Sequence, residues 1–183
     1  MSRVFNVSHH KCGTTSVHHA LEILGYKSYH CFNPDHLLKI HLEGQVAEDP
    51  LLREDNTAWG DLPITLMYRA LYEAFPDATF LFVRRDPISW IESLRRHMAG
   101  WTIPLAIHTL VYGYPMTNSN FDPRVCLRAY ERICGDILEF FNSKPNFHLI
   151  EFKDLSWKTL CQAVGKPEPV VPFPWENKSA VIS

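Results

Sequence analysis

A continuous apolar run, Thr79-Phe80-Leu81-Phe82-Val83, is the feature that most restricts the fold of this chain. Runs of this length without polar alternation are typical of a parallel strand that is covered by helices on both faces. Asp86-Pro87 follows the run, and an Asp cap with Pro at the first helical position predicts that a helix begins there. The run therefore predicts a central strand that passes directly into a helix.

The same order of strand and helix recurs along the chain. Residues 3–8 predict a first strand, residues 15–24 a helix on which Val17, Ala20, Leu21 and Leu24 share one face, and residues 26–31 a second strand. Further helices are expected over residues 33–43, 61–75, 123–142 and 156–164, with a strand at 147–152 and an acidic surface loop at 44–57. This alternation predicts a three-layer α/β domain (αβα) with a mainly parallel central sheet, in which ligands bind beyond the carboxyl ends of the strands.

Length and charge narrow the class of protein. The 183 residues suit a single domain over 1–183, ending in a proline-rich extended arm from about residue 167. Eighteen Lys and Arg against twenty Asp and Glu leave a net charge of −2 without a basic block, which disfavours nucleic acid as a partner. No apolar stretch approaches the roughly 20 residues of a membrane span, and the start does not resemble a secretory signal.

The five cysteines are scattered and form no CxxC pair. We expect reduced thiols that lie mostly in the core, and a cytoplasmic location.

The segment of residues 10–16, His-Lys-Cys-Gly-Thr-Thr-Ser, lies where the first strand passes into a helix. Such a turn presents free backbone N–H groups and the positive end of a helix dipole to an anion. Gly13 permits close approach of the backbone, and Lys11 adds a mobile positive charge. Three hydroxyl donors follow, on Thr14, Thr15 and Ser16. The segment predicts a site for a phosphate-type anion, but Lys11 precedes Gly13, unlike the order in the GxxxxGK[ST] loop of nucleoside triphosphate enzymes.

Two arginines, Arg84 and Arg85, stand at the end of the apolar run, and Ser93 follows Arg85 by eight residues. The guanidinium of an Arg presents a planar fork of donors to a phosphate, and a Ser about two turns into the next helix can meet the same anion from the side. The alternative is a solvated turn in which Asp86 simply caps the helix.

Together, the Lys-x-Gly-Thr-Thr order at Lys11 and the spacing of Arg85 and Ser93 resemble the sulfotransferase superfamily, which has a P-loop NTPase-like fold. The closing stretch, residues 171–178, is similar to the end of a bacterial-type sulfotransferase family. The resemblance implies that residues 11–16, Cys12 included, hold the 5′-phosphosulfate of the donor 3′-phosphoadenosine-5′-phosphosulfate (PAPS). It implies that Arg85 and Ser93 hold the 3′-phosphate.

The same resemblance implies that the arm folds over the nucleotide. Lys178 would then reach phosphate, and Phe173 or Trp175 would stack on adenine. A proline-rich arm that is packed by its own aromatic residues is the alternative.

By this resemblance the reaction is an in-line transfer of the sulfuryl group to a hydroxyl or amine of a small-molecule or carbohydrate acceptor, with PAP as product and no metal required. Lys11 would neutralise the charge on the leaving phosphate. Asp61 is the first candidate for the general base, with helix capping as its alternative, and His30 is the second. We find no apolar strand that ends in Asp, and no tight metal-ligand spacing among the ten histidines.

Some positions depart from the family pattern. Asn6 and Ser8 stand where family members usually have Gly, and Cys12 replaces a common Thr. His9 and His10 add bulk, and could add charge, beside the anion. Two alternatives therefore stay open: a nucleotide-binding protein of the same fold that has lost transfer activity, and a small P-loop kinase, which the order of Lys and Gly disfavours.

Acceptor contacts are expected from two poorly periodic regions, residues 44–59 and 97–120. Four aromatic residues in them could wall an acceptor site: Trp59, Trp101, Tyr112 and Tyr114. The short chain favours an open cleft or one that a second subunit completes, as in a homo-oligomer.

Overall fold

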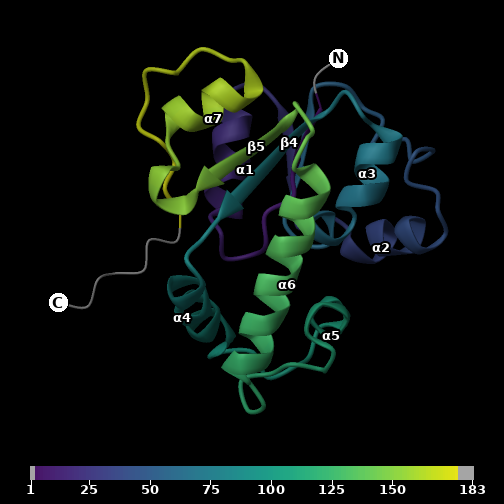
Figure 1. Cartoon of the computed structure of the whole chain (residues 1–183), viewed down its shortest axis with the longest axis vertical. Coiled ribbons are helices and arrows are strands. Elements are labelled where there is room, and N and C mark those ends of the chain that lie inside the picture. The colour runs from purple at the N-terminus through teal and green to yellow at the C-terminus, as the bar shows by residue number, and fades with distance from the viewer. Residues whose placement is uncertain (1–2, 177–183) are drawn as a thin grey trace.

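The computed structural model describes residues 3–176, in which five parallel strands form one sheet in the order β2-β3-β1-β4-β5 (Figure 1). The strands are β1 (Val4–Asn6), β2 (Lys27–His30), β3 (Thr57–Gly60), β4 (Thr79–Arg84) and β5 (Phe147–Glu151). Because β1 pairs with β3 on one side and β4 on the other, it lies at the centre of the sheet.

Helices flank the sheet, and in Figure 1 α7 and α6 lie on opposite sides of the strands β4 and β5. The helices are α1 (Thr14–Ile23), α2 (Pro34–Leu42), α3 (Tyr68–Ala74), α4 (Pro87–Met98), α5 (Ala106–Tyr112), α6 (Pro123–Phe141) and α7 (Trp157–Val164). Two short 3-10 turns, η1 (Ile64–Leu66) and η2 (Phe152–Asp154), follow β3 and β5. The α/β fold with a parallel sheet is as the alternation predicts.

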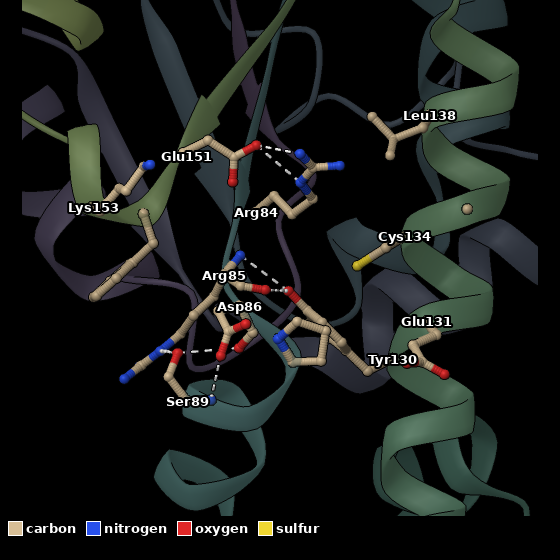
Figure 2. Close-up of a pocket in the computed structure, with 13 residues that line it drawn as sticks. Arg84, Arg85, Asp86, Ser89, Tyr130, Glu131, Cys134, Leu138, Glu151 and Lys153 are labelled. Carbon is tan, nitrogen blue, oxygen red and sulfur yellow. Dashed lines mark hydrogen bonds and ion pairs between the residues drawn. The ribbon is translucent and has the colours of Figure 1, made fainter.

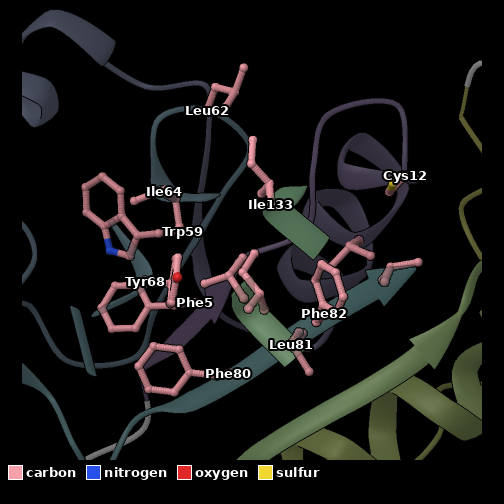
Figure 3. Close-up of a cluster of buried hydrophobic side chains, with 14 of the residues drawn as sticks. Phe5, Cys12, Trp59, Leu62, Ile64, Tyr68, Phe80, Leu81, Phe82 and Ile133 are labelled. Atoms are coloured by element: carbon pink, nitrogen blue, oxygen red, sulfur yellow. The ribbon is translucent and has the colours of Figure 1, made fainter. Parts of the chain in front are cut away.

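The apolar run at 79–83 forms β4, an interior strand whose residues 80–83 are at most 1% exposed. Phe80 packs against Phe5 of β1, with 5.5 Å between ring centroids (Figure 3). The ring of Phe141 of α6 lies 5.0 Å from that of Phe80. Burial on both faces accounts for the absence of polar alternation in this run. The prediction of a covered strand is confirmed.

Three elements differ from the sequence-based expectation. Strand β3 follows the region predicted as a loop, α5 lies within a region without clear periodicity, and the helix expected over 61–75 is broken into η1 and α3. At the break, the hydroxyl of Thr65 donates a hydrogen bond to the carbonyl of Ser8 at 2.6 Å. Each of these elements is short, so its periodicity is weak and its contacts with the sheet decide its conformation.

All five cysteines are free thiols, as expected, and Cys31 is the exposed one. Within residues 3–176, no helix has both the length and the apolar character that crossing a membrane requires.

Candidate active site

A cleft of about 370 Å³ opens where the loops after β1, β2, β3 and β4 meet. The loop before α1 and its first turn form one wall, and α4 with the segment 97–108 forms another. Phe152 after β5, and Trp175 and Glu176 at the end of the described part of the C-terminal arm, complete the lining. The position agrees with the general rule that parallel α/β sheets bind ligands beyond the carboxyl ends of their strands.

The first wall is a helix N-terminus that no side chain caps within the described chain. Gly13 precedes α1 with φ 77°, and a Cβ at this position would lie 3.0 Å from Cε2 of Phe152. Both the left-handed backbone and the close ring therefore favour glycine here. The first turn of α1 carries no acidic residue. Its N–H groups and dipole are thus free to attract an anion.

Arg85 lies beside this loop and is held there from several sides. Its Nη1 donates to the carbonyl of Lys11 at 2.9 Å, its Nε donates to Ser89 Oγ at 3.1 Å, and its guanidinium carbon lies 4.5 Å from the ring centroid of Phe152. The hydroxyl of Tyr130 accepts from the Arg85 N–H at 3.0 Å and donates to the Arg85 carbonyl at 2.6 Å (Figure 2). These contacts tie the turn after β4 to the loop after β1.

Arg84 points away from that cleft. Its Nε donates to Glu151 Oε1 at 3.0 Å, and both residues line a second hollow of about 610 Å³ between β5 and α6 (Figure 2). This hollow is the larger of the two, but it contains none of residues 10–16. Arg85 lines both hollows, but of the two neighbouring arginines only Arg85 also lines the cleft and contacts the loop.

Asp61 and His30, the two candidate bases, lie together at the first turn of α1. Asp61 Oδ2 accepts from Thr14 Oγ1 at 3.0 Å and lies 3.0 Å from His30 Nε2, while Oδ1 accepts from the Leu62 N–H at 2.7 Å. Burial by itself raises the pKa of Asp61, but the hydrogen bond with His30 and the nearby imidazoles outweigh it and hold the pKa well below its usual range. Asp61 is thus a carboxylate with several bound donors.

The position of Asp61 corrects the sequence analysis, which found no apolar strand ending in Asp. Strand β3 ends at Gly60, directly before Asp61, and it pairs with the central strand β1. Four residues are too few to carry a strand pattern in the sequence, so only pairing reveals this strand.

Neutral histidines line the other end of the cleft. His97 and His108 both contribute to the lining, and burial lowers the pKa of each below its ordinary value. His108 is only 4% exposed, and its Nδ1 has no partner within the described residues. The sequence analysis did not single out these two residues, because the helix α5 that carries His108 showed no clear period.

Comparison with known proteins agrees with this geometry. The sequence matches the sulfotransferase domain family over residues 3–182. The chain belongs to the sulfotransferase family. Its structure is similar to the crystal structure of a sulfotransferase from Alicyclobacillus acidocaldarius, with a TM-score of 0.59 and 17% sequence identity over 94% of this chain and 84% of that chain.

A gluconokinase from Sinorhizobium meliloti 1021 has a related fold, with a TM-score of 0.50 and 14% identity over 90% of this chain and 89% of that chain. No curated protein matches the sequence. At these identities the two structures show the fold alone, so the roles of individual residues depend on the geometry of the cleft.

The structure brings most of the predicted site residues of this sulfotransferase-family chain to one cleft. They are Lys11, Gly13, Thr14, Thr15, Ser16, His30, Asp61, Arg85 and Ser93. Burial lowers the pKa of Lys11, and the positive charges of Arg85 and Arg96 lower it further, while Asp61 opposes them. Two predicted residues are not in this group. Cys12 is fully buried with its Sγ 3.8 Å from Tyr130 Oη, and Lys178 lies outside the described residues.

His9 and His10, which could have added charge beside the anion, are buried and neutral. His9 is fully buried and contacts Trp90 edge-on at 5.1 Å between ring centroids, and burial lowers its pKa to about 4. His10 is buried as well, and its Nε2 bonds to the hydroxyl of Tyr112. Burial lowers the pKa of His10 well below its ordinary value, so neither imidazole adds a charge at physiological pH.

The expected aromatic wall is only partly present. Trp101 lines the cleft, but Trp59 is buried in β3, where its ring stacks on Tyr29 at 4.1 Å. Tyr112 is buried against His10, and the hydroxyl of Tyr114 accepts from the Asp122 N–H at 3.2 Å. Neither tyrosine lines the cleft. The prediction was wrong for Trp59 because β3 was not foreseen.

The C-terminal arm reaches the first turn of α1. The Glu176 N–H donates to Ser16 Oγ at 2.9 Å, and Trp175 lines the cleft with its ring edge-on to Phe152 at 5.8 Å. Phe173 instead packs on Trp157 at 5.1 Å. The described part of the arm thus offers one aromatic ring, that of Trp175, to a ligand in the cleft.

Asn6 and Ser8, the two residues before the loop that depart from the family pattern, are buried in the interior. Ser8 Oγ accepts from the Val83 N–H at 2.6 Å, and Asn6 Oδ1 accepts from the Ser8 N–H at 3.3 Å. Neither residue lines the cleft. The side chain of Ser8 joins the segment after β1 to β4, and the side chain of Asn6 holds Ser8. These departures from the family pattern therefore change the interior and not the wall of the site.

Proposed function

We propose that this protein transfers the sulfuryl group of PAPS to a hydroxyl or amine of a small acceptor. The observation that carries the proposal is the hydrogen bond from Arg85 to the carbonyl of Lys11, which sets a second cation beside an uncapped helix N-terminus. A donor with separate 5′ and 3′ anionic groups fits two such neighbouring sites.

In this proposal the first turn of α1 holds the 5′-phosphosulfate. The backbone of Gly13 and the hydroxyls of Thr14, Thr15 and Ser16 donate hydrogen bonds, and Lys11 follows the bridging oxygen as negative charge develops on it. Cys12 contributes its backbone only, since its thiol is buried. Catalysis by positioning and by charge neutralisation suits a loose transition state.

Arg85 and Ser93 would bind the 3′-phosphate from the adjacent turn. The stacked position of the Arg85 guanidinium on Phe152 limits its motion, so little side-chain entropy is lost when it binds phosphate. Trp175 is the described residue that can stack on adenine, and Lys178 is kept as a further phosphate ligand on the resemblance to the family alone.

The proton of the acceptor goes either to Asp61 directly or to an imidazole such as His30. The low pKa of Asp61 makes it a weak base, but its hydrogen bonds orient Thr14 and His30. A pH profile of kcat separates these roles. A carboxylate base with a pKa held as low as that of Asp61 gives a flat profile from about pH 5 to 8, whereas an imidazole base loses activity when acid protonates it. Asp61→Asn and His30→Gln identify which residue causes the pH dependence.

Calorimetry with PAP, the desulfated product, tests the donor directly. We expect saturable binding that Arg85→Ala weakens strongly and that Arg84→Ala leaves unchanged, because Arg84 is paired with Glu151 outside the cleft. Equal PAP affinity of the wild type and Arg85→Ala would overturn the proposal. Sulfate transfer from labelled PAPS to a panel of alcohols, phenols, sugars and amines then identifies the acceptor, with Lys11→Ala as the inactive control.

One observation favours a second candidate, a P-loop kinase. Thr14 of the loop bonds to Asp61 at the end of β3, and in nucleoside triphosphate enzymes a loop hydroxyl and a carboxylate at a strand end hold Mg²⁺ together. Here His30 already occupies one oxygen of that carboxylate. Binding of ATP with Mg²⁺ in preference to PAP would favour the kinase. PAP binding without turnover on any acceptor would indicate a protein that has lost transfer activity.

A further inference from the structure

A cluster of metal-binding residue types lies on α1, beyond the cleft. One ring nitrogen each of His18 and His19 and one carboxylate oxygen of Glu22 lie within 4.8 Å of one another. Glu176, at the end of the described arm, adds a second carboxylate, with Oε1 3.3 Å from His19 Nδ1. His18, His19 and Glu22 thus meet at one point of α1, and Glu176 contacts one of them, His19.

The contact of His18 with strand β2 orients this cluster. His18 Nδ1 lies 2.8 Å from the hydroxyl of Ser28, so this nitrogen has a hydrogen-bond partner on the side away from Glu22. When Nδ1 carries the proton and donates it to Ser28, Nε2 presents its lone pair to Glu22. Histidines that bind metals are oriented in this way by a partner at the second ring nitrogen.

The spacing also fits a cation between the two side chains. His18 Nε2 and Glu22 Oε2 are 3.8 Å apart, which is too long for a direct hydrogen bond. Two ligands on a tetrahedral Zn²⁺ with bonds of about 2.1 Å are roughly 3.4 Å apart. Rotation of the exposed Glu22 side chain closes the remaining difference.

We propose that His18, His19 and Glu22 bind one divalent transition-metal ion of the Zn²⁺ type. Imidazole and carboxylate ligands suit Zn²⁺, Ni²⁺ and Cu²⁺, whereas Mg²⁺ and Ca²⁺ prefer sets made of oxygen alone. The inference depends on the geometry of these side chains and is independent of the proposed sulfuryl transfer.

The end of the described arm lies next to this site. Glu176 donates its N–H to Ser16 Oγ and places its carboxylate beside His19. His18, His19 and Glu22 lie on a different part of α1 from the residues that line the cleft.

Calorimetric titration of the full chain with Zn²⁺, after removal of any histidine tag, tests the site. We expect binding of one Zn²⁺ at micromolar concentration or tighter. Glu22→Gln and His18→Ala should each weaken it at least about tenfold, and Ser28→Ala should weaken it by a similar factor through the orientation of His18. His36→Ala is the matched control, because His36 pairs with Asp49 elsewhere on the surface.

Two results would overturn the proposal. One is the absence of saturable Zn²⁺ binding to the wild-type chain. The other is binding that Glu22→Gln leaves as tight as in the wild type, since Glu22 is exposed and its replacement preserves the fold.

Discussion

Two strand-to-helix turns border the cleft, and they begin their helices in opposite ways. No side chain in the described part of the chain caps α1, which follows Gly13, whereas the carboxylate of Asp86 accepts from the Ser89 N–H at 2.9 Å and caps α4. At a helix N-terminus capped by a carboxylate, that carboxylate already accepts hydrogen bonds from the free N–H groups. At an uncapped N-terminus these N–H groups can bind an external anion. In the proposed function, the first turn therefore binds through its backbone and the second through the side chain of Arg85.

We expect the largest effect from loss of Lys11, which supplies the mobile positive charge of the first turn. Lys11→Ala should lower kcat by about 10²–10³-fold, the range for loss of one group that stabilises developing charge. Single-turnover sulfate transfer from labelled PAPS measures it. PAP binding by the same variant is the control for folding, and a kcat within threefold of the wild type would remove Lys11 from catalysis.

In the second turn, the two neighbouring arginines provide a matched pair. Arg85→Ala should weaken PAP binding about 10- to 100-fold, because a hydrogen bond to a charged group contributes about 1.5–3 kcal/mol. Arg84→Ala should leave the affinity within about twofold, since Arg84 pairs with Glu151 in the other hollow. Calorimetry measures both variants. Equal losses would mean that general positive charge, and not the position of Arg85, binds the nucleotide.

Gly13→Ala tests whether the first turn depends on its backbone. The added methyl must tolerate φ 77° and a contact of 3.0 Å with Phe152. We expect a loss of about 1–3 kcal/mol in the free energy of unfolding, the usual cost of a residue in a sparsely populated backbone region. Urea denaturation measures it. Gly44→Ala has the same sign of φ but no atom within 4 Å, so it isolates the backbone contribution from the contact with Phe152.

The smallest effect is expected from the cap of the second turn. Asp86→Ala should lower the free energy of unfolding by about 1 kcal/mol, the typical value of an N-cap, and change PAP affinity by less than twofold. Asp86→Asn should keep the free energy of unfolding close to that of the wild type, because an amide oxygen can accept the same hydrogen bond. A large loss of PAP affinity in Asp86→Ala would show that both helix N-termini act on the ligand, and the contrast between the turns would fail.

The two turns could be found in the sequence because they depend on local patterns. The apolar run, Arg84 and the Asp86-Pro87 cap lie within a few residues of one another, and the loop with Gly13 is likewise a short continuous segment. Strand β3 and helix α5 were not predicted from such local patterns. They are short, and pairing and packing with distant segments stabilise them more than any pattern of their own.

The histidines also show what local sequence patterns cannot predict. The residue type of His9 and His10 suggested charge beside the anion, but burial keeps both neutral. No sequence pattern predicted His97 or His108 as site residues, although both line the cleft. The exposure of an imidazole depends on segments that fold over it, and its pKa follows from that exposure.

By itself, the sequence determined the alternation of strands and helices, the α/β class and the loop chemistry, since these depend on periodicity and on neighbours in the chain. Tertiary structure alone decided that Arg85 joins the loop while Arg84 leaves it, that Asp61 meets both Thr14 and His30, and that Trp59 is a core residue. Each of these outcomes depends on contacts between segments far apart in the chain, and a local pattern does not encode them.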